Sequence, residues 1–345
     1  MIRLGYQIPF FNFPGATPGN VFENVASQAV AAEKSGFDTV LVMDHFYQLP
    51  GLGQPDDYML ECYSLLAALA ARTEKIELSS LVTGNTYRNP TVLAKTITTL
   101  DVISKGRAVL GIGAGWFQLE HDALGFEFGT FTDRFEKLEE ALQIIIPMIR
   151  GEKPSFEGKH YWVKEAINEP PPVRKIPIMI GGSGEKKTLR MVAQYADESN
   201  LVCMPDEIPR KLEVLDEHCS NLGRDRSEIS VSWLGTLGIA PSQGEAEVAR
   251  NEFFAARGLE WDSLDEEFQK ALTARIIMGG PDEVREQVQS LIDMGLDGLT
   301  VNMPASGHDP EICLLYTSPS PRDVEEWGLA ACGGGKKGGG GGGGG

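Results

Sequence analysis

Three short apolar runs that stop abruptly at glycines or polar residues most constrain how this chain can fold. They occupy residues 39–45, 108–116 and 178–184. A buried parallel strand reads as a continuous apolar run, and a glycine at its end lets the backbone turn sharply and approach a ligand closely. Three such endings in one chain predict a barrel of parallel strands whose chemistry lies at one rim.

The apolar runs alternate with helical patterns along the chain. We expect strands at 3–8, 39–43, 77–82, 108–112, 178–180, 199–203, 229–237 and 298–302. Between them, apolar residues recur at helical spacing, as at 132–150 and 282–294. Eight strands with intervening helices favour an α/β fold of the (β/α)8 type, a TIM barrel. A doubly wound sheet is disfavoured because the first turn, at 9–15, has no GxGxxG pattern.

Three segments depart from this alternation. Residues 153–172 predict a hairpin, and 241–280 form a polar, acidic insertion, the kind of segment that forms lids or binding walls in barrels. From Leu314 the chain is similar to a translated sequencing adapter and then ends in glycines, a composition that cannot offset its ordering entropy. We therefore expect a barrel domain over 1–311 and a disordered low-complexity tail over 312–345, a sequencing or assembly artefact. The last barrel helix would then be missing or replaced.

Charge and composition disfavour several classes of partner. The 345 residues carry a formal net charge of −18 at pH 7, which repels nucleic acid and anionic membrane surfaces. No run of eighteen apolar residues is present, and the first residues lack the layout of a signal peptide, so we expect a cytoplasmic protein. The five cysteines are scattered and lack metal-binding spacing, so we expect reduced thiols and no metal site.

Asp44 and His45 directly follow the second expected strand and would lie on the catalytic rim. A histidine there can exchange a proton near neutral pH, and Asp44 could orient it or bond a cofactor ring. The alternative is an aspartate that caps the following loop beside a histidine with satisfied hydrogen bonds.

Two glycine-rich turns are candidate ligand-binding segments. The turn at 111–115 indicates close approach by either a ligand or another strand, with Trp116 as a flat apolar wall. Glu120 could serve as an acid or base, but we expect it at a solvated helix start. The turn at 181–184 predicts an anion site, because amides at a helix N-terminus and the Ser183 hydroxyl favour phosphate. Its alternative is a glycine-rich helix cap.

Taken together, these segments resemble the luciferase-like monooxygenase superfamily, and in particular its branch dependent on the deazaflavin coenzyme F420. The resemblance covers about residues 1–310 and is carried by residues 4–9, 35–45, 83–90, 111–120, 134–142 and 177–186. It implies a (β/α)8 barrel that binds F420, or alternatively FMN, at the carboxyl ends of its strands, and a possible homodimer.

The resemblance also implies roles for individual residues. It implies a non-proline cis peptide near Leu81–Val82, and proton exchange at His45. The sugar-phosphate dehydrogenase branch has a glutamate where this chain has Trp116, which argues against sugar-phosphate oxidation. The expected catalytic residues are His45 and Asp44; the cofactor-binding residues are Asp44, Leu81, Val82, Thr83, Gly113, Ala114, Gly115, Gly181, Gly182, Ser183 and Gly184; and the substrate-binding residues are Tyr6, Phe10, Phe46 and Trp116.

We therefore expect an F420-dependent oxidoreductase that transfers a hydride to or from a small organic substrate, in a direction left open. One alternative is an FMN-dependent monooxygenase of the alkanesulfonate type, because reduced flavin forms a peroxide with oxygen whereas the 5-deaza ring does not readily do so. Another is a non-catalytic flavin-binding protein. An aldolase or isomerase barrel is disfavoured because no lysine is evidently placed as a Schiff-base donor.

Overall fold

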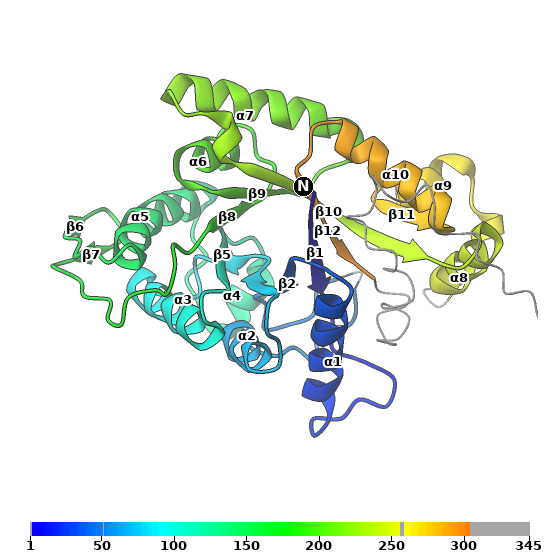
Figure 1. Ribbon diagram of the computed structural model, residues 1–345, viewed down its shortest axis with the longest axis horizontal. Coiled ribbons are helices and arrows are strands. Elements are labelled where there is room, and N and C mark those ends of the chain that lie inside the picture. The colour runs from blue at the N-terminus through cyan, green and yellow to red at the C-terminus, as the bar shows by residue number, and fades with distance from the viewer. Residues whose placement is uncertain (1, 51, 256–258, 304–345) are drawn as a thin grey trace, which may run out of the picture.

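The computed structural model describes residues 2–50, 52–255 and 259–303, and its centre is a closed ring of parallel strands (Figure 1). The ring consists of β1 (Arg3–Ile8), β2 (Thr39–Val42), β3 (Glu77–Ser80), β5 (Ala108–Gly113), β8 (Ile178–Gly181), β9 (Glu198–Leu201), β10 (Ser230–Ile239) and β12 (Gly298–Asn302). Each strand pairs with the next in this order, and β12 returns to β1. The predicted (β/α)8 barrel is confirmed.

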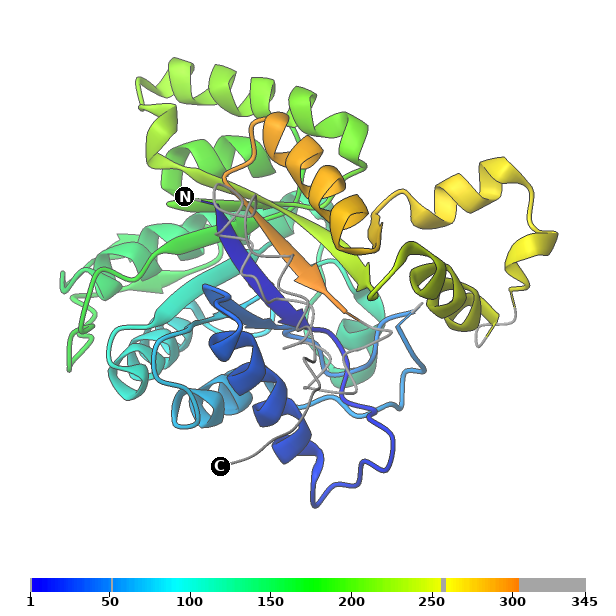
Figure 2. The same ribbon diagram turned by 45° about the vertical axis from the view of Figure 1, so that its right-hand side comes forward.

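Helices surround the barrel and cover the outward faces of its strands (Figures 1 and 2). They are α1 (Val21–Lys34), α2 (Cys62–Ala70), α3 (Pro90–Ser104), α5 (Phe131–Ile149), α6 (Thr188–Tyr195), α7 (Ile208–Leu222) and α10 (Pro281–Asp293). The short helix α4 (Gln118–Leu124) lies instead in the loop after β5, against the loop of residues 44–47. The helical spacing correctly identified the packed face of α5, where Leu138, Leu142 and Ile145 are buried. No helix in the described part of the chain is both long enough and apolar enough to cross a bilayer.

The remaining elements lie in loops and insertions. They are β4 (Thr83–Gly84), β6 (Phe156–Glu157), β7 (Trp162–Val163), α8 (Gln243–Ala255), α9 (Glu266–Thr273), β11 (Ile276–Gly279) and the 3-10 turns η1 (Pro205–Glu207), η2 (Arg226–Glu228) and η3 (Trp261–Ser263). Strands β6 and β7 form the expected hairpin. Within 241–280, α8 and α9 project to the side of the barrel, and β11 extends the end of β10 in parallel (Figure 2).

Strand β11 was not predicted, because its four residues follow a polar segment without strand periodicity. The predicted tail at 312–345, and with it the predicted loss or replacement of the helix after β12, lies outside the described residues. The boundary at residue 311 therefore stays a prediction.

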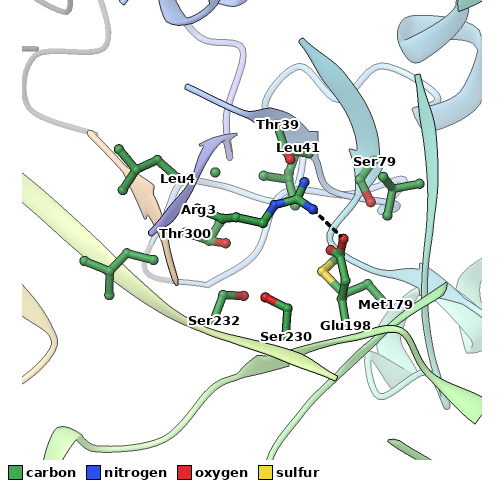
Figure 3. Close-up of a pocket in the computed structure, with 13 residues that line it drawn as sticks. Arg3, Leu4, Thr39, Leu41, Ser79, Met179, Glu198, Ser230, Ser232 and Thr300 are labelled. Carbon is green, nitrogen blue, oxygen red and sulfur yellow. Dashed lines mark hydrogen bonds and ion pairs between the residues drawn. The ribbon is translucent and has the colours of Figure 1, made fainter. Parts of the chain in front are cut away.

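A polar cluster closes the inside of the barrel where the strands begin (Figure 3). Arg3 on β1 donates to Glu198 at 3.1 Å and also to Glu77, and Arg174 donates to Glu77 at 2.5 Å. These ion pairs neutralise charges at the end of the barrel opposite to the rim where barrel enzymes carry their chemistry.

Gly111 on β5 lies against the backbone of β3. A Cβ atom on Gly111 would stand 1.9 Å from the carbonyl oxygen of Ser80, far inside any non-bonded contact. The Ser80 hydroxyl also donates to the Gly111 carbonyl oxygen at 2.8 Å. Of the two explanations that the sequence left open for this glycine, the structure therefore favours a neighbouring strand.

We expect Gly111→Ala to lower the free energy of unfolding by about 1–3 kcal/mol, because the added methyl group must displace backbone of β3. Gly238→Ala on β10 is the matched control, since its Cβ would make an ordinary 3.4 Å contact with Met278. Urea unfolding followed by circular dichroism compares the two. Equal losses would mean that the general cost of alanine in a strand, and not this contact, sets the effect.

Candidate active site

A cavity of about 660 Å³ opens where the barrel strands end. This volume is within the usual range for small-molecule and cofactor sites, and the carboxyl ends of the strands are where barrel enzymes carry their active sites. The predicted residues that line it are Asp44, His45, Leu81, Val82, Thr83, Gly115, Trp116, Gly181 and Gly182. Among the predicted cofactor-binding residues, Gly113, Ala114, Ser183 and Gly184 are not part of the lining.

Asp44 is held in a buried ion pair. Arg88 donates to both carboxylate oxygens, at 2.6 and 3.0 Å, and the Gly84 amide donates to Oδ2 at 3.2 Å. Burial raises the pKa of Asp44, while the bonds from Arg88 oppose that rise. Burial by itself would lower the pKa of Arg88, but its bonds to Asp44 and Glu61 raise it overall. Asp44 thus fixes the loop after β3 through Gly84 and Arg88, a structural role different from the expected cap of its own loop, and its contact with a cofactor ring stays a prediction.

Glu120 on α4 is fully buried, so the expectation of a solvated helix start is wrong. Its Oε2 lies 3.0 Å from Nδ1 of His45 and also accepts the hydroxyl of Tyr87. Its Oε1 accepts the amides of Phe46 and Tyr47 at 2.5 and 2.8 Å. Burial tends to raise the pKa of Glu120, but these hydrogen bonds lower it overall, so the side chain is a carboxylate at neutral pH.

His45 lines the cavity beside two aromatic rings. The rings of Trp116 and Phe117 meet it edge-on, with centroids 5.9 and 5.6 Å away. Only 11% of its side chain is exposed. Because Nδ1 faces Glu120, Nε2 is the ring nitrogen left for a ligand in the cavity.

The predicted cofactor-binding segments meet at one wall of the cavity. The Leu81–Val82 peptide bond is cis, as the resemblance implied. Gly113 and Gly181 flank Val82, and a Cβ on either would lie within 2.9 Å of a Val82 methyl group. Glycine at these two positions therefore leaves the room that Val82 occupies between β5 and β8.

The turn at 181–184 differs from its prediction in one respect. Helix α6 begins only at Thr188, so the turn does not stand directly at a helix N-terminus. The Ser183 hydroxyl accepts the Val202 amide at 2.8 Å and thereby joins the turn to the end of β9. Gly182 has a φ of +118°, which favours glycine. Phosphate binding by this turn stays a prediction.

Only one of the four predicted substrate-binding residues, Trp116, lines the cavity. The prediction for Tyr6 is wrong: this side chain is 2% exposed and its hydroxyl donates to Gln28 of α1. Neighbouring residues of a strand face opposite sides, so Gln7 points into the barrel and Tyr6 out of it. Phe10 packs beside Phe13, and Phe46 stacks on Phe126, so neither reaches the cavity.

Several polar residues of the cavity were not predicted because no local motif contains them. Asn302 on β12 donates to Gln7 on β1 at 3.0 Å. Asn200 on β9 is buried, and its Oδ1 has no hydrogen-bond partner among the described residues. Arg275 donates to the carbonyl oxygen of Leu234 at 2.9 Å, and burial lowers its pKa. Asn200 thus offers a free acceptor to a ligand in the cavity.

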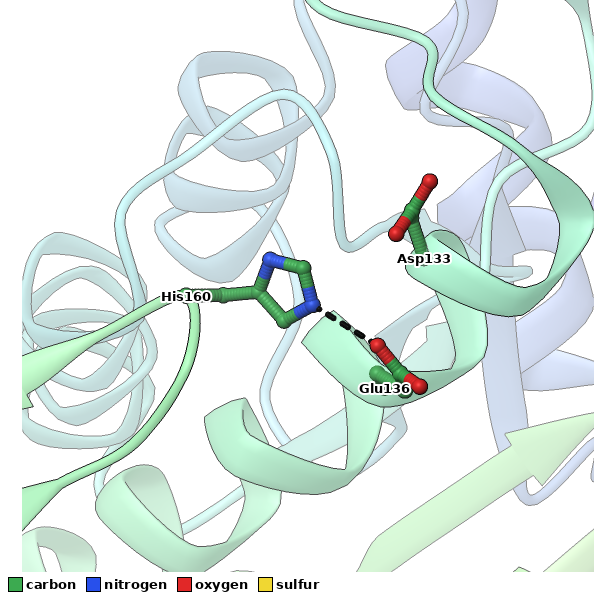
Figure 4. A group of neighbouring side chains, drawn as sticks. All are labelled: Asp133, Glu136 and His160. Atoms are coloured by element: carbon green, nitrogen blue, oxygen red, sulfur yellow. Dashed lines mark hydrogen bonds and ion pairs between the residues drawn. The ribbon is translucent and has the colours of Figure 1, made fainter.

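A cluster of Asp133, Glu136 and His160 lies on α5 and the β6–β7 hairpin (Figure 4). The Lys159 ammonium group bonds Glu136 at 2.8 Å and reaches Asp133 at 3.4 Å. Asp133 also accepts the hydroxyl of Thr130 in the cap of α5. Since these contacts already account for the two carboxylates, we assign no metal to the cluster.

We expect Arg88→Met to destabilise the protein by about 3–5 kcal/mol, because it leaves Asp44 buried without its partner. The loss should grow as the pH rises above the pKa of a free aspartate side chain, about 4, and level off above the raised folded-state pKa of Asp44. Burial raises the folded-state pKa of Asp44, so the folded variant favours a bound proton and loses that advantage as the pH rises. Urea unfolding across this pH range measures both effects.

Arg72→Met is the matched control for this variant. Arg72 also donates two hydrogen bonds to one carboxylate, that of Glu23, each at 2.9 Å, but both side chains are exposed to solvent. Its replacement should change stability little. A similar result for the two variants would contradict a special cost for the buried pair.

Known proteins resemble this chain along most of its length. An F420-dependent glucose-6-phosphate dehydrogenase of Microbacterium testaceum (strain StLB037) is 31% identical over 300 residues, which cover 82% of this chain and 87% of that protein. A protein of the same name from Nakamurella multipartita is 28% identical over 335 residues, which cover 90% of this chain and 92% of the relative.

Solved structures show the same fold at lower sequence identity. An F420-dependent secondary alcohol dehydrogenase, in complex with an F420–acetone adduct, aligns with a TM-score of 0.72 and 20% identity over 91% of this chain and 99% of that one. An EDTA monooxygenase from Chelativorans sp. BNC1 aligns with a TM-score of 0.78 and 17% identity over 94% of each chain.

A family model supplies the remaining comparison. The model described as luciferase-like monooxygenase matches residues 2–298, and these residues contain the whole of β1 through α10. The same span includes the His45–Glu120 pair, the cis peptide and the glycine turn of the cavity wall. The chain belongs to the luciferase-like monooxygenase family.

Proposed function

We propose that this chain is an oxidoreductase that binds coenzyme F420 and transfers a hydride to or from a small organic substrate. The observation that carries the proposal is the relative named as F420-dependent, which is 31% identical over 300 residues. A match of that length spans most of the barrel and its rim. The F420-dependent alcohol dehydrogenase adds only a likeness of fold.

The cavity is suited to a flat, polar ring system. Gly84, Gly115, Gly181 and Gly182 line it, so a ring can lie close to backbone there. The unpartnered Oδ1 of Asn200 offers an acceptor to a donor on the ligand. When bound, the deazaflavin supplies a hydride acceptor or donor. The residues proposed to hold it are Leu81, Val82, Thr83, Gly181, Gly182, Ser183 and Gly184.

His45 would handle the proton that accompanies the hydride. When an alcohol becomes a carbonyl, the carbon loses a hydride and the hydroxyl loses a proton. Nε2 of His45 can accept that proton, and in the reverse direction it can return it. Trp116, at the edge of the cavity, exposes 62% of its surface and offers the substrate an apolar face.

Glucose 6-phosphate, the substrate in the relatives' names, is not part of this proposal. In the resemblance that the sequence carries, Trp116 stands where the sugar-phosphate branch has a glutamate. An indole ring cannot accept a proton or bind a sugar hydroxyl as a carboxylate does. We therefore propose a less polar substrate, in contact with Trp116.

A flavin-dependent monooxygenase is the second candidate, because the matched family model carries that activity in its description. Parallel fluorescence titrations with F420 and FMN separate the two. We expect F420 to bind and FMN to bind more weakly, without oxygen consumption in the presence of reduced FMN. Tight FMN binding with oxygen consumption would overturn the F420 proposal in favour of the monooxygenase.

We expect His45→Asn to keep F420 binding and to slow substrate-dependent F420 reduction by about 10²–10⁴-fold, since a positioned proton acceptor contributes that much. The screen would use small alcohols, with the absorbance of oxidised F420 as the signal.

His160→Asn is the matched control for this variant. His160 also bonds a glutamate, at 3.1 Å, and also has an 11% exposed side chain, but it lies on the remote hairpin. Its replacement should leave the rate unchanged. Equal rates for His45→Asn and the native protein would remove His45 from the reaction.

A further inference from the structure

We infer that Glu120 is a positioning residue that fixes His45 with its proton on Nδ1, so that Nε2 is the nitrogen that exchanges a proton with the substrate. The inference rests on the proposed function for the identity of the reaction. It concerns a residue that does not line the cavity and acts only through His45.

The two oxygens of Glu120 perform separate tasks. Oε1 accepts the amides of Phe46 and Tyr47, which holds the loop after β2 against α4. Oε2 faces His45 Nδ1 at 3.0 Å and the hydroxyl of Tyr87. A carboxylate that served only to fix the loop would need Oε1 alone, so the contact of Oε2 with His45 calls for its own explanation.

The hydrogen-bond partners of Glu120 determine whether its two oxygens and Nδ1 of His45 carry a hydrogen. Backbone amides can only donate, so Oε1 must be an acceptor. With three donors, the two amides and the hydroxyl of Tyr87, around a buried carboxyl group, the ionised form is the one that satisfies every contact. An ionised Oε2 requires a hydrogen on the atom that faces it. Nδ1 of His45 therefore carries a proton even when the imidazole ring is neutral.

The consequence for catalysis is a histidine with one defined role. Neutral His45 presents a lone pair at Nε2 and can accept a proton there. After it accepts the proton, the positive ring lies beside the negative Glu120, which stabilises the charged state. Among the described residues, two further ionisable groups lie beside it: Tyr87, which donates to the same carboxylate, and Asp44, which is paired with Arg88.

Glu120→Gln tests the inference with little change of shape. The amide oxygen can still accept the two backbone amides, while the amide nitrogen replaces Oε2 and donates to His45. His45 Nδ1 must then become an acceptor, and the neutral ring carries its hydrogen on Nε2, where it can no longer take a proton. We expect substrate oxidation to slow by about 10²-fold or more, because the wrong tautomer at a catalytic histidine has costs of that order.

The decisive readout is the tautomer of His45, observed by ¹⁵N NMR of histidine-labelled protein without cofactor or substrate. His45→Asn identifies the resonance. We expect hydrogen on Nδ1 in the native protein and on Nε2 in Glu120→Gln, with F420 affinity within about twofold of native. A neutral imidazole released from Glu120 would also carry its hydrogen mainly on Nε2, so hydrogen on Nδ1 in the native protein is the observation that decides.

Glu136→Gln is the matched control, because it changes the glutamate partner of the remote His160 in the same way. It should alter neither the tautomer of His45 nor the rate. A native His45 with hydrogen on Nε2 would overturn the inference, and this measurement holds even if Glu120→Gln does not fold. The expected tautomers in a protein that binds no F420 would support the positioning role and contradict the proposed function instead.

Discussion

Closure of the parallel strand ring is the constraint on which the site depends. Because the strands of the ring are parallel, every strand ends at the same rim. Because β12 pairs back to β1, residues far apart in the sequence meet at that rim. Gln7 and Asn302 are hydrogen-bonded neighbours although they lie near opposite ends of the barrel sequence. The ring also demands close backbone approach, as at Gly111, so its glycines serve the barrel as well as the cavity.

Two carboxylates are buried at the loop of residues 44–47: Asp44 belongs to this loop, and Glu120 accepts hydrogen bonds from its amides. Their different partners give them different functions. Asp44 is matched by the permanent cation of Arg88, so neither member of that pair is suited to exchange protons. Glu120 is instead surrounded by amides, a hydroxyl and the imidazole ring of His45. The fold thus separates an ion pair that holds the loop from a hydrogen-bonded pair of which one member, His45, lines the cavity.

The sequence predicted those parts of the molecule whose residues follow one another along a strand. The apolar runs located the eight barrel strands and the rim, including His45 and the turn at 181–184. The direction of a side chain was harder to predict, because a shift of one residue along a strand turns every side chain to the opposite face. Tyr6, which we expected at the substrate, points to α1 instead. We expected Glu120 to be exposed to solvent because the first residues of a short helix usually are. The spacing of Phe117, Glu120 and His121, all buried, was the signal of an inward face.

The least predictable wall of the cavity comes from the insertion. Leu272, Arg275 and Ile276 reach the site from α9 and the start of β11, a segment whose sequence is polar and lacks strong periodicity. Strand ends and short loops supply His45, the cis peptide and the glycines, so the residues proposed for proton exchange and cofactor binding belong to the barrel itself. The insertion supplies apolar and cationic groups on top of it. Under the proposed function, such a division would let the barrel keep its hydride-transfer chemistry while the inserted wall determines which substrate fits.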